Sequence, residues 1–155
     1  MPHDQEYGGP WLATAVFCEK VLIEKDGVPS IIRVVDRIMM TASGAAPPEK
    51  MPLTTLNVTA FIALKSGFAK GNMEIKLIGH KPSQQVFATT TLPVFLEGDE
   101  HGANAVLEVA MQVNEDGLYW FDVLIGERLV TRMPLRVVYQ RLMSGPGTGL
   151  AQGPP

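Results

Sequence analysis

The sequence is poor in the residues that build reactive or cross-linked sites. Its 155 residues include one cysteine, Cys18, and three histidines, His3, His80 and His101. A single cysteine excludes an intramolecular disulfide framework, and a chain of this size buries enough surface to fold without one. The histidines and their acidic neighbours do not have zinc-ligand spacing. The sequence therefore predicts no metal site, no cofactor and no catalytic residue.

Long apolar runs and an excess of basic residues are also missing. Polar residues interrupt every apolar stretch, and none approaches the roughly 20 residues that a membrane-spanning helix needs. The net charge is -3, with lysine and arginine spread along the chain, whereas a nucleic-acid surface usually shows a basic patch. Residues 1–10 lack the basic start and apolar stretch of a secretory signal. We therefore expect a cytoplasmic protein with neither a membrane nor a nucleic-acid partner.

Helical periodicity is absent, and β-type alternation takes its place. Hydrophobic residues make up 46% of the chain, enough for a core, and they recur at every second position between Gly, Pro and Asp-Gly turn signals. This pattern predicts an all-β domain, an antiparallel β-sandwich of about eight strands, immunoglobulin-like or C2-like. We expect residues 1–10 to form a flexible leader, 11–141 the sandwich domain and 142–155 a flexible Gly/Pro-rich tail.

The turn signals also set the expected strands. These cover residues 11–24, 30–41, 53–65, 72–78, 84–92, 104–113, 118–125 and 129–138. Alternation gives the longer strands an inward face, which we predict to hold Leu56, Val58, Ala60, Ile62, Leu64, Leu107, Val109, Met111, Val113, Tyr119, Phe121, Val123 and Ile125. A short helical turn over residues 139–143 is also compatible with the sequence.

The stretch from Glu115 to Phe121 resembles the tyrosine corner of immunoglobulin-like sandwiches. In that motif a tyrosine near the start of a strand bonds to backbone in the preceding turn, and a cysteine follows two residues later. Here Tyr119 follows Gly117, and Phe121 takes the place of the cysteine, which suits a version without the disulfide. A plainer reading, in which Gly117 makes a turn and Tyr119 is simply a core aromatic, stays open.

Three pieces of the chain resemble a family of short prokaryotic β-sandwich proteins with no assigned function. They are Ala15-Val-Phe-Cys-Glu19, Ser30-Ile-Ile-Arg-Val-Val-Asp36, and Gly117-Leu-Tyr-Trp-Phe121 followed by Met133-Pro-Leu-Arg-Val137. The resemblance covers residues 11–138 and implies the fold. It implies no activity, because a fold does not supply a function.

Cys18 and Asp36 each have a structural and a functional interpretation. A reactive thiol needs a lowered pKa, and Cys18 lies among strand hydrophobes, so we favour a small buried side chain. Asp36 shares an apolar face if its segment is one strand, and a carboxylate there must be paired or hydrogen-bonded. We expect it to bind backbone or to pair with Arg37 or Lys20. Convergence of Asp36, Cys18 and a histidine would instead indicate an enzymatic pocket.

Acidic residues cluster in two predicted loops. They are Glu97, Asp99, Glu100, Glu115 and Asp116. Sandwich loops gather at the ends, and calcium takes carboxylate oxygens, so a calcium site is conceivable. Solvated turn residues explain the same acids equally well.

The outward face of the last two strands is the most informative surface. It carries Leu118, Trp120, Asp122 and Leu124 on one strand and Arg128, Val130, Arg132, Pro134, Arg136 and Val138 on the other. Apolar patches rimmed by charge mark partner surfaces, and Trp and Arg are favoured at binding hot spots. We therefore predict a partner interface formed by Leu118, Trp120, Leu124, Arg132 and Arg136, for which a homodimer fits. There are two alternatives. Loop 42–51 or the leader could cover Trp120, or these residues could be apolar side chains of the kind that are scattered over most protein surfaces.

These features favour a non-catalytic protein-interaction or scaffold module, with a protein partner or a homo-oligomer. One alternative is a small-ligand-binding or enzymatic domain with its site at the loop end of the sandwich. Another is a phage or secretion-apparatus structural component, which rests on analogy alone.

Overall fold

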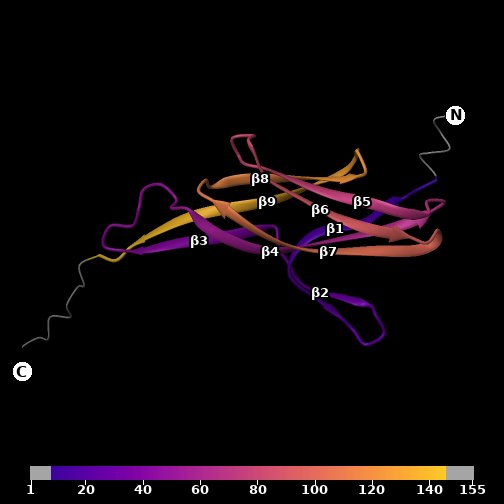
Figure 1. The fold of residues 1–155 in the computed structure, drawn as a ribbon. Helices are drawn as coiled ribbons and strands as arrows, with labels where there is room; N and C mark the ends of the chain where they lie inside the picture. Colours follow the sequence, from indigo (N-terminus) through magenta and orange to yellow (C-terminus); the bar gives the residue numbers. More distant parts are fainter. Residues whose placement is uncertain (1–7, 146–155) are drawn as a thin grey trace, which may run out of the picture.

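The computed structural model describes residues 8–145, which form nine strands in two facing sheets (Figure 1). The strands are β1 (Trp11–Ile23), β2 (Pro29–Val34), β3 (Arg37–Gly44), β4 (Thr54–Gly67), β5 (Gly71–His80), β6 (Val86–Leu96), β7 (Asp99–Val113), β8 (Gly117–Ile125) and β9 (Arg128–Met143). Sheet A has the order β2-β1-β4-β7 and sheet B the order β3-β9-β8-β5-β6. The all-β class and the sandwich-like arrangement are confirmed. In this part of the chain, no helix is long and apolar enough to cross a membrane.

The expected eight strands become nine because segment 30–41 is not one strand. Its first part pairs with β1, where Val34 lies opposite Cys18, and its second part pairs in parallel with β9 from Arg37 onward. The chain changes sheet in between, and the Val35 amide donates to the Phe17 carbonyl at 2.7 Å. The prediction was wrong because apolar alternation continues through the crossing while the partner strand changes, and alternation carries no information about partners.

Three further boundaries differ from the prediction. The helical turn over 139–143 is wrong, because β9 continues to Met143 and enters the predicted tail. β7 begins at Asp99, so most of the expected acidic loop is strand. β6 continues through Pro93, which an edge strand tolerates. Residues 1–7 of the leader and 146–155 of the tail lie outside the described residues.

The core lies between the sheets, where the alternation placed it. All of the predicted inward residues on β4, β7 and β8 are at most 7% exposed. Ile75, Leu77, Met133, Leu135 and Val137 complete the layer from sheet B. Each such side chain contributes roughly 1.5–3 kcal/mol when fully buried. Burial of these residues therefore determines which face of each sheet points inward, and the opposite face points outward.

The turn before β8 has the hydrogen bond that the tyrosine corner predicts. The Tyr119 hydroxyl donates to the Glu115 carbonyl at 2.7 Å, four residues back along the chain. Burial raises the pKa of Tyr119, which keeps the hydroxyl protonated as a donor. Gly117 has a φ of 132°, and a Cβ at that position would approach the Pro82 ring at 3.0 Å. This corner fixes the direction in which β8 starts.

The outer half of β1 and all of β2 leave the sandwich as a two-stranded arm (Figure 1). β1 pairs with β4 only as far as Cys18, and from there to Ile23 it pairs with β2 alone. Ile23, Val28 and Val34 on this arm are more than half exposed. Isolated two-stranded ribbons are marginal in water, so we expect the arm to be the least stable part of sheet A.

Candidate interaction surface

The predicted interface residues lie together on the outer face of sheet B, across β8 and β9. Trp120 on β8 lies between Pro134 on β9 and His80 on β5. Leu118 lies opposite Arg136. Leu118, Trp120 and Leu124 are half-buried, whereas Arg132 and Arg136 are exposed. We call the group Leu118, Trp120, Leu124, Arg132, Pro134 and Arg136 the Trp120 patch.

Asp122 is the electrostatic centre of this face. Its Oδ1 accepts a hydrogen bond from Arg132 Nε at 2.6 Å, and its Oδ2 lies 3.0 Å from His80 Nε2. The Asp122 and His80 side chains are only 17% and 20% exposed, against 51% for Arg132. Charge-assisted bonds of this kind are shorter and stronger than neutral ones, so the three side chains hold one another in place.

The Asp122 carboxyl has a pKa below its ordinary value of 3.8. Burial alone would raise this pKa, but the hydrogen bonds from Arg132 and then from His80, with their positive charges, outweigh it. The carboxylate therefore stays ionised at neutral pH and remains available to Arg132.

Arg132 also links this network to Trp120. Its guanidinium carbon lies 5.8 Å from the centre of the Trp120 ring, within the range of a cation–π contact. The ring is therefore held between a fixed cation and the side chains of neighbouring strands. A large aromatic side chain with its position fixed before binding loses little conformational freedom when a partner covers it.

Loop 42–51 and the described part of the leader both dock away from Trp120. The Tyr139 hydroxyl donates to the Pro48 carbonyl at 2.7 Å, and Arg141 donates to the Pro47 carbonyl at 2.9 Å. The Pro10 carbonyl accepts from Arg128, the first residue of β9. Neither segment therefore provides the cover that was the main alternative to an interface.

The prediction of this face was wrong at Val130 and incomplete at His80. A register shift in the β8–β9 ladder, between Val123 and Leu124, turns Val130 towards the core. His80 lies outside the expected strand 72–78, but it is the last residue of β5. Continuing the alternation of Glu74, Lys76 and Ile78 by two residues would have placed His80 on the outward face.

The other predicted site residues do not assemble. Cys18 is fully buried in sheet A, and burial raises the pKa of its thiol, as its interpretation as a small buried side chain requires. Asp36 is exposed, and its carbonyl accepts from the Arg136 amide, so the prediction of an apolar surrounding was wrong. His80 lies on the far side of the other sheet. Cys18, Asp36 and a histidine therefore do not share a pocket.

The acidic residues considered for a calcium site also lie in two separate places. Asp99 and Glu100 begin β7 and Glu97 lies just before it, while Glu115 and Asp116 follow the end of this 15-residue strand. The two groups are at opposite ends of an extended strand. His101, expected in a loop, is in β7 and contacts the Gly98 carbonyl at 3.1 Å.

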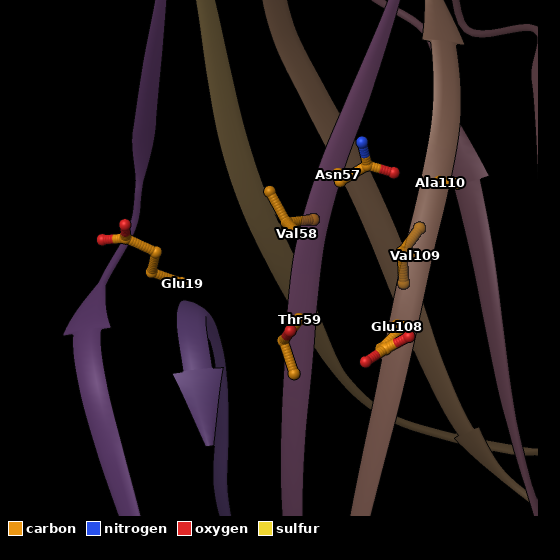
Figure 2. A pocket seen from close by; sticks show the side chains of 7 residues that line it. All are labelled: Glu19, Asn57, Val58, Thr59, Glu108, Val109 and Ala110. Atoms are coloured by element: carbon orange, nitrogen blue, oxygen red, sulfur yellow. The ribbon is translucent and has the colours of Figure 1, made fainter. Parts of the chain in front are cut away.

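Two open cavities lie away from the Trp120 patch. A groove of about 460 Å³ on the outer side of sheet A is lined by Glu19, Asn57, Val58, Thr59, Glu108, Val109 and Ala110. Figure 2 shows the residues of β4 and β7 running side by side there, with Glu19 across the gap. A cavity of about 530 Å³ at the loop end is lined by Glu49, Lys50, Met51, Asn114, Glu115, Asp116, Tyr139 and Arg141. Both linings are rich in charged and polar groups, whereas small-molecule pockets are mostly apolar.

Comparison with known proteins gives no family for this chain. Neither a known protein family nor a curated protein matches it. Among solved structures it is similar to part of a β-glucosidase from Listeria innocua in complex with glucose, with a TM-score of 0.41, 12% identity and 59% of this chain covered. The same enzyme in complex with isofagomine gives a TM-score of 0.37, 15% identity and 61% coverage. The chain spans 16% of the length of each, and a likeness at this level carries no argument about fold type or activity.

Proposed function

We propose that this chain is a non-catalytic protein-interaction module whose contact surface is the Trp120 patch on the outer face of sheet B. The observation that supports it is Trp120 itself, a large aromatic ring held in place by Arg132 on a face that neither loop 42–51 nor residues 8–10 cover. Buried Trp and Arg anchors carry most of the binding energy at protein interfaces. The Asp122 network sets the Arg132 side chain in advance, which lowers the entropy cost of binding.

We also propose that the sandwich is of the immunoglobulin type. The adjacent strands β1, β4 and β7 match A, B and E of that fold, and β6, β5, β8 and β9 match C′, C, F and G. The tyrosine corner then falls at the start of strand F, where that fold has it. The resemblance to short prokaryotic β-sandwich proteins and the cytoplasmic location stay predictions.

Site-specific photo-cross-linking in the native host tests the contact surface. A photoreactive amino acid replaces Leu118 in the patch or, as a matched control, Val106 on the outer face of sheet A, where the residue is 39% exposed. We expect covalent protein adducts from position 118 that disappear when Trp120→Glu is added, and none from position 106. Equal adducts from both positions, or none from position 118, would contradict the proposal. An adduct with the mass of two chains would identify a homodimer.

A further inference from the structure

Two arginines on the outer face of sheet B, Arg37 and Arg136, are not matched by carboxylates of the described residues. Arg132 is paired with Asp122. Arg37 and Arg136 are direct neighbours in the parallel β3–β9 ladder, and both are exposed. Within residues 8–145, neither forms an ion pair, although Asp36 precedes Arg37. This pair is therefore a positive spot that no carboxylate of the described residues neutralises. Like charges directly opposite each other also destabilise a sheet.

The positive spot adjoins the apolar part of the Trp120 patch. Ile38 and Val137 pack against or within the core, so alternation turns Arg37 and Arg136, the residues beside them, outward. Leu118 is the neighbour of Arg136 on β8. A partner that covers Leu118 and Trp120 therefore also lies over the two arginines.

We infer that the partner of this surface is an acidic segment of a protein chain that also carries apolar side chains. Its carboxylates would pair with Arg37 and Arg136, because the guanidinium fork matches a carboxylate in two parallel hydrogen bonds. Its apolar side chains would cover Leu118 and Trp120. This inference rests on the proposed function, to which it adds the chemistry of the partner.

Charge argues against a second copy docked face to face. A two-fold axis close to Arg136 would set the arginines of one copy against those of the other, because the same patch of both copies forms the contact. Like charges across an interface disfavour a complex, and complementary charges favour it. Among the strand residues that the structure describes, alternation places one other carboxylate on this face, Glu74, which lies on β5 towards the opposite end, next to Gly126.

Selection from a displayed library of short random peptides on the immobilised full-length chain tests the inference. The variants are Trp120→Glu, the pair Arg37→Glu with Arg136→Glu, and a control pair, Lys25→Glu with Arg33→Glu. The control makes the same change in net charge at exposed residues of the β1–β2 arm and its turn. We expect the peptides enriched on the wild-type chain to be acidic with apolar residues. Their affinity should fall at least about tenfold on the Arg37/Arg136 variant and stay unchanged on the control.

The other outcomes separate this inference from the proposed function. Neutral or basic peptides that bind the wild-type chain but not Trp120→Glu would overturn the acidic partner and leave the contact surface standing. No enrichment over Trp120→Glu would overturn both. A wild-type dimer in sedimentation that Trp120→Glu abolishes and the Arg37/Arg136 variant retains or strengthens would show that the partner of this surface is a second copy, which also overturns the inference.

Discussion

The two sheets differ in how they hold their charges. On sheet A, Glu19 and Arg33 form an ion pair at 3.2 Å whose side chains are 57% and 79% exposed. On sheet B, Asp122 and Arg132 pair at 2.6 Å, and the carboxylate is only 17% exposed. The first pair lies where the β1–β2 arm leaves the sandwich, and the second lies on a central strand beside Trp120. The ion pair with the less exposed carboxylate is thus the one that also contacts His80 and Trp120.

The largest effect is expected in the free energy of unfolding when one carboxylate is removed from each sheet, Asp122 from sheet B and Glu108 from sheet A. Asp122→Ala should lower the free energy of unfolding by about 1–2 kcal/mol, because it leaves His80 and Arg132 without their acceptor. Glu108→Ala, on the exposed outer face of sheet A, should change it by less than about 0.5 kcal/mol. Urea unfolding of both variants measures the difference. Equal losses would remove the distinction between the two faces.

The same carboxylate should give a pH-dependent difference in stability. The pKa of Asp122 is lower in the folded chain than its ordinary value of 3.8, so its contribution is fully present above that value. It is lost as the pH falls through the folded pKa. The gap in unfolding free energy between the wild-type chain and Asp122→Asn should therefore close as the pH falls below 3.8 and through the folded pKa. A gap that persists into strong acid would show that ionisation of Asp122 is not its source.

A smaller coupling is expected between Arg132 and Trp120. A double-mutant cycle with Arg132→Gln and Trp120→Leu should give an interaction energy of about 0.5–1 kcal/mol, as a cation–π contact at a partly exposed site provides. The leucine keeps apolar cover and removes only the ring face. A coupling of zero would mean that Arg132 is positioned by Asp122 alone.

The smallest effect is expected for the ion pair on sheet A. A cycle with Glu19→Ala and Arg33→Ala should give a coupling below about 0.5 kcal/mol, because water and salt screen exposed pairs. Thermal unfolding at low and moderate salt measures it. A coupling as large as that of Asp122 with Arg132 would show that shielding by neighbouring strands does not explain the contrast.

Alternation along the sequence was sufficient to predict which side chains of these strands face the core and which face outward. It placed Leu107, Tyr119 and Phe121 in the core and Leu118 and Trp120 outside, because a two-residue period is a local property of extended backbone. The turn residues also predicted the Tyr119 hydrogen bond, since its donor and acceptor lie four residues apart.

Contacts that depend on which strands are neighbours could not be predicted in this way. Asp122 meets His80 only because β8 pairs with β5, and Arg37 meets Arg136 only because β3 joins the last strand. Both contacts join residues far apart in the sequence. The change of sheet after Val34 was missed for the same reason, because the residues on both sides of it have the same apolar texture.

The parallel pairing of β3 with β9 also bears on the order of events during synthesis. β3 is made early, but within residues 8–145 its neighbour in sheet B is β9, the last of the nine strands. A growing chain on the ribosome therefore carries Arg37 on an unpaired segment until β9 has emerged, and contacts this remote in sequence form slowly. Arg37 and Arg136 can come together only after β9 has emerged, so a partner that needs both cannot engage a shorter nascent chain.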